Sequence, residues 1–146
     1  VATTTQLNTP GPVLACLEGV HAVTDGTGFG LAGHLLEVCK GSGLRATVNY
    51  ADLPLLARAG EFVEAGLMTG ASGRNWASYG DRVSLAAGLD SSAQTLLSDP
   101  QTSGGLLVSC APDTVTEVLS LFLQHGVTHV SVIGETTEGE PGIAVV

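Results

Sequence analysis

The amino-acid sequence predicts an α+β domain in which helices flank a mixed β-sheet. The chain has 146 residues, of which 44% are hydrophobic, and a mean hydropathy of +0.34, so it can bury a core as one domain. Segments that alternate between apolar and polar residues interleave with segments whose apolar residues recur at helical spacing. The last two predicted strands are joined by a connection of hairpin length, which favours α+β over a doubly wound sheet.

The first part of the chain contains a strand, a helix and a second strand in the predicted order. A short strand over residues 21–25 ends in a turn, and a helix follows over residues 29–40, stopped by Gly41. Residues 44–50 then alternate as a strand. The helix presents one apolar stripe, formed by Leu31, Ala32, Leu35, Leu36 and Cys39.

The middle of the chain combines another predicted helix with a long polar stretch. Asp52 is the predicted N-cap of a helix over residues 53–65, and Pro54 is tolerated in its first turn. Residues 68–83 are predicted to be irregular, which in a compact domain is typical of a functional or mobile segment. In the last part we expect helices over 91–97 and 112–125, and strands over 105–111, 127–134 and 142–146.

The charge balance limits what the chain can bind. Five Lys and Arg residues stand against 14 Asp and Glu residues, which gives a net charge of −9, and residues 83–146 contain no Lys or Arg. Binding of nucleic acid through a basic surface is therefore excluded, because it needs clustered cations. If the protein handles phosphates, the positive charge must come from metal ions, backbone N–H groups or another segment of polypeptide.

Other features exclude further classes. No apolar run has the length of a membrane span, and the first residues lack the pattern of a signal peptide. The three cysteines form no CxxC pair and are odd in number, which favours a reducing, cytoplasmic location. The four histidines show no metal-ligand spacing, and we expect them to be structural or solvated, with His34 on the polar face of its helix.

A first candidate site is the glycine-containing segment at residues 24–30, TDGTGFG, between a predicted strand and a helix N-terminus. A strand that turns through glycines into a helix directs backbone N–H groups and the helix dipole towards an anion. Asp25 could then hold a Mg²⁺ ion that bridges phosphate oxygens. The alternative is that Asp25 caps the following helix and that the glycines only make a tight turn.

A second candidate site is the polar segment at residues 98–105, SDPQTSGG, which leads into an apolar strand. Pro100 biases Asp99 away from helix, and the paired glycines permit close approach of the backbone. The segment is either a binding loop or an ordinary connection from helix to strand. Residues 69–75 are a third candidate loop, for which an unbound, mobile loop is the favoured interpretation.

These segments closely resemble the C-terminal domain of the selenophosphate synthetase (selenide, water dikinase) family. That family carries a TDVTGFGL-GHL segment, matched here at residues 24–35, and a DPQTSGGLL segment, present unbroken at residues 99–107. An Arg-Asn pair after a glycine-rich loop is matched by Arg74 and Asn75. The similarity extends over nearly the whole chain, from about residue 13 to residue 139. Gly26 departs from the family, which usually has Val at that position, but the departure removes no ligand.

The resemblance implies a fold like the C-terminal domain of aminoimidazole ribonucleotide synthetase. It implies that residues 1–146 form the single C-terminal domain of a longer, homodimeric, two-domain enzyme that binds ATP in a cleft between its domains. The implied reaction converts ATP, selenide and water into selenophosphate, AMP and phosphate. Asp25 matches the family's Mg²⁺ ligand. The residues expected close to the nucleotide or its phosphates are Thr24, Thr27, Gly28, Gly30, Asn75, Asp99, Gln101, Thr102 and Ser103.

The residues that the family uses for catalysis are expected in its N-terminal domain. Its nucleophilic Cys or selenocysteine, a nearby Lys and further Mg²⁺-binding aspartates lie in the N-terminal domain, and none is present here. We therefore expect no catalytic residue in this chain and no activity from it alone. Two alternatives remain: an ATP-binding relative of the same fold, such as aminoimidazole ribonucleotide synthetase, thiamine-phosphate kinase or a hydrogenase-maturation protein, and a non-catalytic binding or assembly module.

Overall fold

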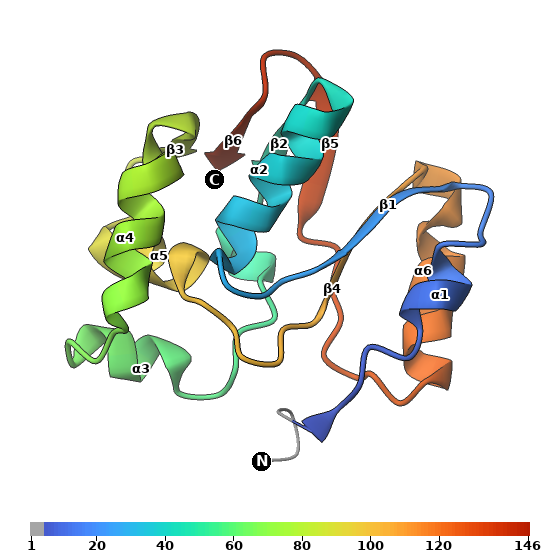
Figure 1. The fold of residues 1–146 in the computed structure, drawn as a ribbon, viewed down its shortest axis with the longest axis horizontal. Helices are drawn as coiled ribbons and strands as arrows, with labels where there is room; N and C mark the ends of the chain where they lie inside the picture. The colour runs from blue at the N-terminus through green and yellow to red at the C-terminus, as the bar shows by residue number, and fades with distance from the viewer. Residues whose placement is uncertain (1–4) are drawn as a thin grey trace.

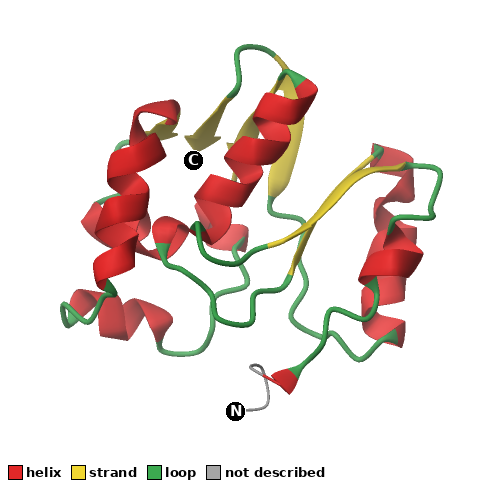
Figure 2. Cartoon of the chain, viewed as in Figure 1, coloured by secondary structure: helices red, strands yellow, loops and turns green. Residues whose placement is uncertain are grey.

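The chain forms two lobes that are joined by a two-stranded ribbon. A computed structural model describes residues 5–146; residues 1–4, which begin the predicted domain and its N-terminal segment, lie outside the described residues. The ribbon pairs β1 (Val20–Asp25) with β4 (Leu106–Cys110) in antiparallel fashion. A four-stranded sheet with most of the helices lies on one side of the ribbon, and two helices lie on the other (Figures 1 and 2).

The larger lobe contains a mixed four-stranded sheet, as the sequence predicts. Its strands are β2 (Leu44–Val48), β3 (Val83–Leu85), β5 (Gly134–Glu138) and β6 (Gly142–Val145), in the order β3-β6-β2-β5. β6 runs parallel to both β2 and β3, whereas β5 runs antiparallel to β2. β5 and β6 are joined by a short turn, but they are not neighbours, because β2 lies between them.

Helix α2 (Gly30–Ser42) packs against β2 and β6 and buries its predicted apolar stripe. The stripe joins side chains from the sheet in one hydrophobic cluster, whose fully buried members include Leu36, Val48 and Ile143. The helix ends two residues later than predicted. Gly43, with φ +67°, adopts the left-handed conformation that stops the helix, and not Gly41.

Two predictions for the middle of the chain are wrong. Only residues 59–64 of the expected helix over 53–65 are helical, as α3 (Ala59–Glu64), because Leu53 precedes Pro54 and is extended. Asp52 lies in a 3₁₀ turn and caps no α-helix. The stretch predicted to be irregular, residues 68–83, contains α4 (Gly70–Tyr79) and a 3₁₀ turn at Gly80–Arg82, and it ends where β3 begins. Helix α4 packs against α5 (Ser91–Ser98).

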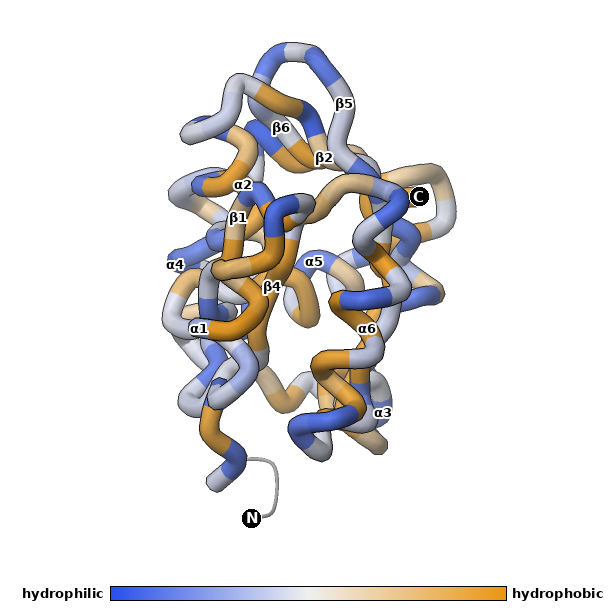
Figure 3. Tube along the Cα trace, turned by 90° about the vertical axis from the view of Figure 1, so that its right-hand side faces the viewer, coloured by the Kyte–Doolittle hydropathy of each residue, from blue (hydrophilic) through white to orange (hydrophobic). Residues whose placement is uncertain are grey.

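The smaller lobe consists of α1 (Gly11–Leu14) and α6 (Val115–Gln124), packed on the ribbon. A second hydrophobic cluster forms around Leu14, Val118 and Phe122, and the apolar stretches of β4 and α6 are visible in Figure 3. The predicted strand over 127–134 is wrong, because regular pairing begins only at Gly134, where β5 starts. No helix in the described part of the chain is long and apolar enough to cross a membrane.

Candidate functional site

The two glycine-containing segments lie side by side, as continuations of the strands of the ribbon. The backbone N–H of Gly26 donates to the carbonyl of Gly105 at 2.8 Å. The backbone N–H of Gln101 donates to the carbonyl of Thr27 at 3.0 Å. These bonds extend the contact between β1 and β4 into the loops, so that segments more than 70 residues apart in sequence form one surface.

Two glycines are required by this close approach. Gly30 begins α2 with φ +69°, and a Cβ atom there would lie 2.7 Å from the carbonyl carbon of Ser98. A Cβ atom on Gly104 would collide with the carbonyl oxygen of Gly26. By contrast, Gly28 has open space around it and no positive φ. The glycines of the two motifs therefore differ in role: Gly30 and Gly104 allow the close approach of the backbones, whereas Gly28 is not needed for it.

Asp25 ends β1 with an exposed carboxylate that makes no hydrogen bond or ion pair with the described residues. The Thr24 hydroxyl donates to the backbone carbonyl of Asp25 at 3.3 Å and leaves its side chain untouched. The alternative role of Asp25 as a helix cap is not observed, because the N-cap of α2 is Phe29, without any side-chain hydrogen bond. Within residues 5–146, no three His, Cys, Asp or Glu side chains gather as a metal site.

Asp99 has a different environment. Its Oδ1 accepts hydrogen bonds from the hydroxyls of Ser72 at 2.9 Å and Thr69 at 3.2 Å. Thr69 is also the N-cap of α4, since its Oγ1 accepts from the backbone N–H of Ser72 at 3.3 Å. The Asp99 side chain thus joins the end of α5 to the start of α4, which is a structural role for this carboxylate.

Asn75 fastens α4 to both motif segments. Its Nδ2 donates to the carbonyl of Gly28 at 2.9 Å and to the carbonyl of Ser98 at 3.0 Å. The hydroxyl of Tyr79, one turn further along α4, donates to the carbonyl of Phe29 at 2.6 Å. Burial raises the pKa of Tyr79 to about 12. The interpretation of residues 69–75 as a mobile loop is therefore wrong, because they form the first turns of a helix that supports the site.

His34 was expected on the polar face of its helix, but its side chain is buried, with 8% of the residue exposed. Nε2 lies 3.4 Å from the hydroxyl of Thr27 and Nδ1 lies 3.4 Å from the carboxylate of Glu37. The ring also contacts that of Phe29, with centroids 5.8 Å apart. The sequence offered a signal for part of this arrangement, because His34 and Glu37 are three residues apart and therefore neighbours on one helix face.

The remaining predicted site residues lie on the exposed rim of the second segment. Gln101, Thr102 and Ser103 are exposed, and the Gln101 side chain donates to the backbone carbonyl of Asp99 at 3.3 Å. The hydroxyls of Thr102 and Ser103 have no hydrogen-bond partner within the described residues. The hydroxyls of Thr102 and Ser103 are close in sequence to the contact between the loops, but they take no part in it.

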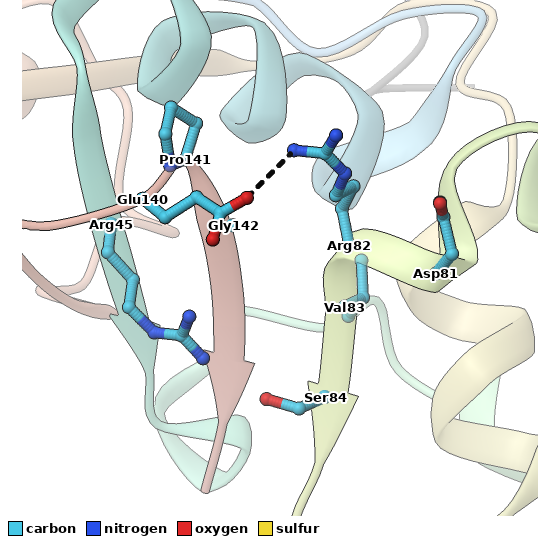
Figure 4. A pocket seen from close by; sticks show the side chains of 8 residues that line it. All are labelled: Arg45, Asp81, Arg82, Val83, Ser84, Glu140, Pro141 and Gly142. Carbon is cyan, nitrogen blue, oxygen red and sulfur yellow. Dashed lines mark ion pairs between the residues drawn. The ribbon is translucent and has the colours of Figure 1, made fainter.

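Among the described residues, one surface hollow is apolar and another is polar. An apolar groove of about 460 Å³ runs between α3 and α5, where Phe62, Leu67 and Met68 adjoin Thr69 and Asp99. A polar hollow of about 330 Å³ lies where β2, β3 and β6 begin, and none of the motif residues lines it (Figure 4).

In the polar hollow, Arg82 and Glu140 point towards each other with a closest N–O distance of 3.9 Å. Arg45 and Arg82 are balanced by Asp81 and Glu140, so the hollow carries no net formal charge.

Comparison with known proteins gives a consistent result. The family model described as "AIR synthase related protein, C-terminal domain" matches residues 6–146. The chain is 82% identical over its whole length to a "Selenide, water dikinase" of Dechloromonas aromatica (strain RCB), of which it covers 42%. It is 58% identical over its whole length to the same-named protein of Paraburkholderia xenovorans (strain LB400), of which it covers 41%. It is 43% identical to that of Yersinia pseudotuberculosis, over 97% of this chain and 39% of the relative. The chain thus spans about two fifths of the length of these relatives.

Proposed function

The chain belongs to the family of AIR synthase related proteins, C-terminal domain, and from this premise we propose that it is the C-terminal domain of an ATP-dependent selenophosphate synthetase. The whole protein would convert ATP, selenide and water into selenophosphate, AMP and phosphate. The observation that supports this role best is the backbone pairing of the two motif segments, Gly26 with Gly105 and Gln101 with Thr27. It gathers the residues of both motifs at one edge of the domain.

Asp25 is the proposed Mg²⁺ ligand of this domain. Its carboxylate is exposed, lies at the end of a paired strand and is not used by any described residue, and these are the properties that a ligand needs. Mg²⁺ takes one or two carboxylates and completes its octahedron with water and phosphate oxygens, so a single Asp fits the donor set. When bound, the ion neutralises charge on the phosphate oxygens, which this acidic chain cannot do alone.

The backbone around Gly28 is proposed to face the phosphates. The first N–H groups of α2 have no acceptor within the helix, and the positive end of the helix dipole lies beside the same loop. Asn75 supports this loop through its hydrogen bond to the carbonyl of Gly28, and Asp99 supports it indirectly through its hydrogen bond from Ser72 of α4. We assign Thr24 and Thr27 to the same edge, with Gln101, Thr102 and Ser103 on the rim of the nucleotide cleft.

The test is to express the full-length parent protein and to follow ATP by ³¹P NMR with and without selenide under anaerobic conditions. We expect AMP, phosphate and a selenophosphate resonance that all depend on selenide. Turnover of ATP to ADP without selenide dependence would contradict this proposal and indicate an ATP-using relative of the same fold. ATP that is bound and left intact would favour a non-catalytic module.

The proposal includes three properties of the whole protein. It acts as a homodimer in the cytoplasm, its N-terminal domain supplies the nucleophile, and the 146 residues alone are inactive because they lack that nucleophile and carry a net charge of −9. Light scattering on the full-length protein tests the dimer. Selenide-dependent ATP cleavage by the 146 residues alone would contradict the third property.

A further inference from the structure

A polar relay crosses the first turns of α2 beside the proposed phosphate loop. His34 is buried in this helix, and its two ring nitrogens contact different partners. Nδ1 lies 3.4 Å from the carboxylate of Glu37, which is one turn further along, and Nε2 lies 3.4 Å from the hydroxyl of Thr27, in the preceding loop. Glu37 is largely exposed, whereas Thr27 is half-buried, so the relay runs from solvent to the loop.

The contacts of His34 favour one direction for its hydrogen bond with Thr27. Nδ1 and the Glu37 carboxylate lie at ion-pair distance, and the negative charge beside Nδ1 favours the tautomer that carries its proton there. In a neutral imidazole the other nitrogen then has a lone pair, and Nε2 can only accept. The hydroxyl of Thr27 can both donate and accept, and it therefore donates its proton to Nε2.

We propose that His34 is a positioning residue. Its Nε2 accepts a hydrogen bond from the hydroxyl of Thr27, so that Thr27 Oγ1 is left as a hydrogen-bond acceptor towards the bound nucleotide complex. This inference rests on the proposed function. With its proton directed to His34, Thr27 cannot donate to a phosphate oxygen. It accepts instead from a group that carries hydrogen, such as a water molecule in the hydration shell of a metal–nucleotide complex.

The arrangement differs from a histidine that only fills space. Packing against Phe29 would be satisfied by a leucine of similar volume, but a leucine offers no acceptor to Thr27. The two explanations therefore make different predictions for variants that keep the shape and remove the polar contact.

The first experiment measures the tautomer of His34 by ¹⁵N NMR at mildly alkaline pH, and it does not depend on activity. In the wild-type protein we expect the proton on Nδ1. Glu37→Ala should shift the population towards the other tautomer, whereas Glu64→Ala, which changes an exposed helical glutamate elsewhere, should not. A wild-type His34 with its proton on Nε2, or one unaffected by Glu37→Ala, would overturn the proposal.

The second experiment is a double-mutant cycle between Thr27→Val and His34→Leu in the full-length protein. We expect each single variant to lower kcat by ~10- to 100-fold, as outer-sphere partners commonly do, and the double variant to lower it little further. Additive losses would show that His34 does not act through Thr27, and would overturn the proposal. His21→Leu, at an exposed position of β1, is the matched control and should retain wild-type turnover.

A variant that fails to fold does not end the test. His34→Gln keeps a polar atom near the position of Nε2, and it should retain more activity than His34→Leu at an unchanged Tm. Equal activity of the Gln and Leu variants would count against the proposal. If the wild-type protein shows no selenide-dependent turnover, the proposed function fails; the cycle is then measured on the Kd for Mg²⁺ with a non-hydrolysable ATP analogue, and the tautomer experiment is unaffected.

Discussion

Asp25 and Asp99 are the same residue type in two segments that touch each other, yet the structure uses them differently. Asp25 ends a strand and presents a carboxylate that no described residue engages. Asp99 ends a helix, and its carboxylate accepts hydrogen bonds from the hydroxyls of Ser72 and Thr69. A carboxylate that already accepts two hydrogen bonds inside the fold stabilises it, whereas an unengaged carboxylate beside a glycine loop is available to a ligand.

The comparison also separates the two motifs. The second segment belongs to the framework of the site, because it is tied to α4 through Asp99 and to the first segment through its backbone. The first segment carries Asp25, whose carboxylate no described residue engages. Substitutions of the two aspartates should therefore affect different quantities, turnover for Asp25 and stability for Asp99.

The largest expected effect is that of Asp25→Ala in the full-length protein. We expect kcat to fall by about a hundredfold or more, because removing an outer-sphere partner alone costs roughly 10- to 100-fold. The Tm should stay close to wild type, since an exposed side chain without partners is removed. Asp52→Asn, at another exposed aspartate, is the control. Wild-type turnover of Asp25→Ala at ordinary Mg²⁺ concentration would contradict the ligand assignment.

The next effect concerns the backbone that places the two aspartates. Gly30→Ala should lower the free energy of unfolding by roughly 3 kcal/mol, because Ala disfavours φ +69° and its Cβ atom would press on the Ser98 backbone. Urea denaturation measures the loss. Gly28→Ala is the matched control in the same loop, and it should be close to neutral, since a Cβ atom there meets nothing within 4 Å. Equal losses for both variants would refute the distinction between the two glycines.

A smaller loss of stability is expected for Asp99→Ala. Removing the acceptor of two hydroxyl protons should cost about 2 kcal/mol, the range for hydrogen bonds to a charged group. We expect a lower Tm, with turnover of the folded protein reduced much less than in Asp25→Ala. The opposite pattern, an unchanged Tm with lost turnover, would make the two aspartates alike and would place Asp99 at the ligand.

The smallest effect tests the support of the first segment from α4. Tyr79→Phe removes the hydrogen bond to the carbonyl of Phe29 and should cost about 1 kcal/mol at neutral pH.

The Tyr79→Phe variant should also differ from the wild-type protein in how its free energy of unfolding depends on pH. The pKa of Tyr79 is raised from 10.0 to about 12, so the unfolded chain releases this proton first, and the stability that it contributes is full below pH 10 and is lost as pH rises to about 12. Unfolding curves over this range should show a smaller alkaline loss for Tyr79→Phe than for wild type. An identical loss in both proteins would assign the alkaline transition to another group.

In the larger lobe the sequence predicts α2, β2, α5 and β6, because periodicity and glycine stops are local signals. The apolar stripe of α2 is buried as predicted, and the β2 and β4 strands lie where alternating and apolar segments stand. Helix α4 was missed since Gly70 and Gly73 have low helix propensity and its polar residues resemble a loop. Its helical signal is the spacing of Ser72, Trp76 and Tyr79, which places one face towards the core.

The site shows the same division. The motifs identify Asp25 and Asp99 as candidates, but spacing alone cannot say which carboxylate the fold itself engages, because the partners Ser72 and Thr69 lie about 30 positions away. His34 was misplaced for a related reason: helical periodicity puts it opposite the apolar stripe, whereas α4 and the motif loop cover that face as well. Long-range packing decides both cases.

The ribbon of β1 and β4 determines how the domain can open. Each lobe has its own hydrophobic cluster, so α1 and α6 can detach without exposing the cluster beneath α2. Native-state hydrogen exchange would therefore divide the amide protons into two cooperative units, one for each hydrophobic cluster. Because Asp25 is the last residue of β1, unfolding of the unit that contains this strand would also displace the proposed metal ligand.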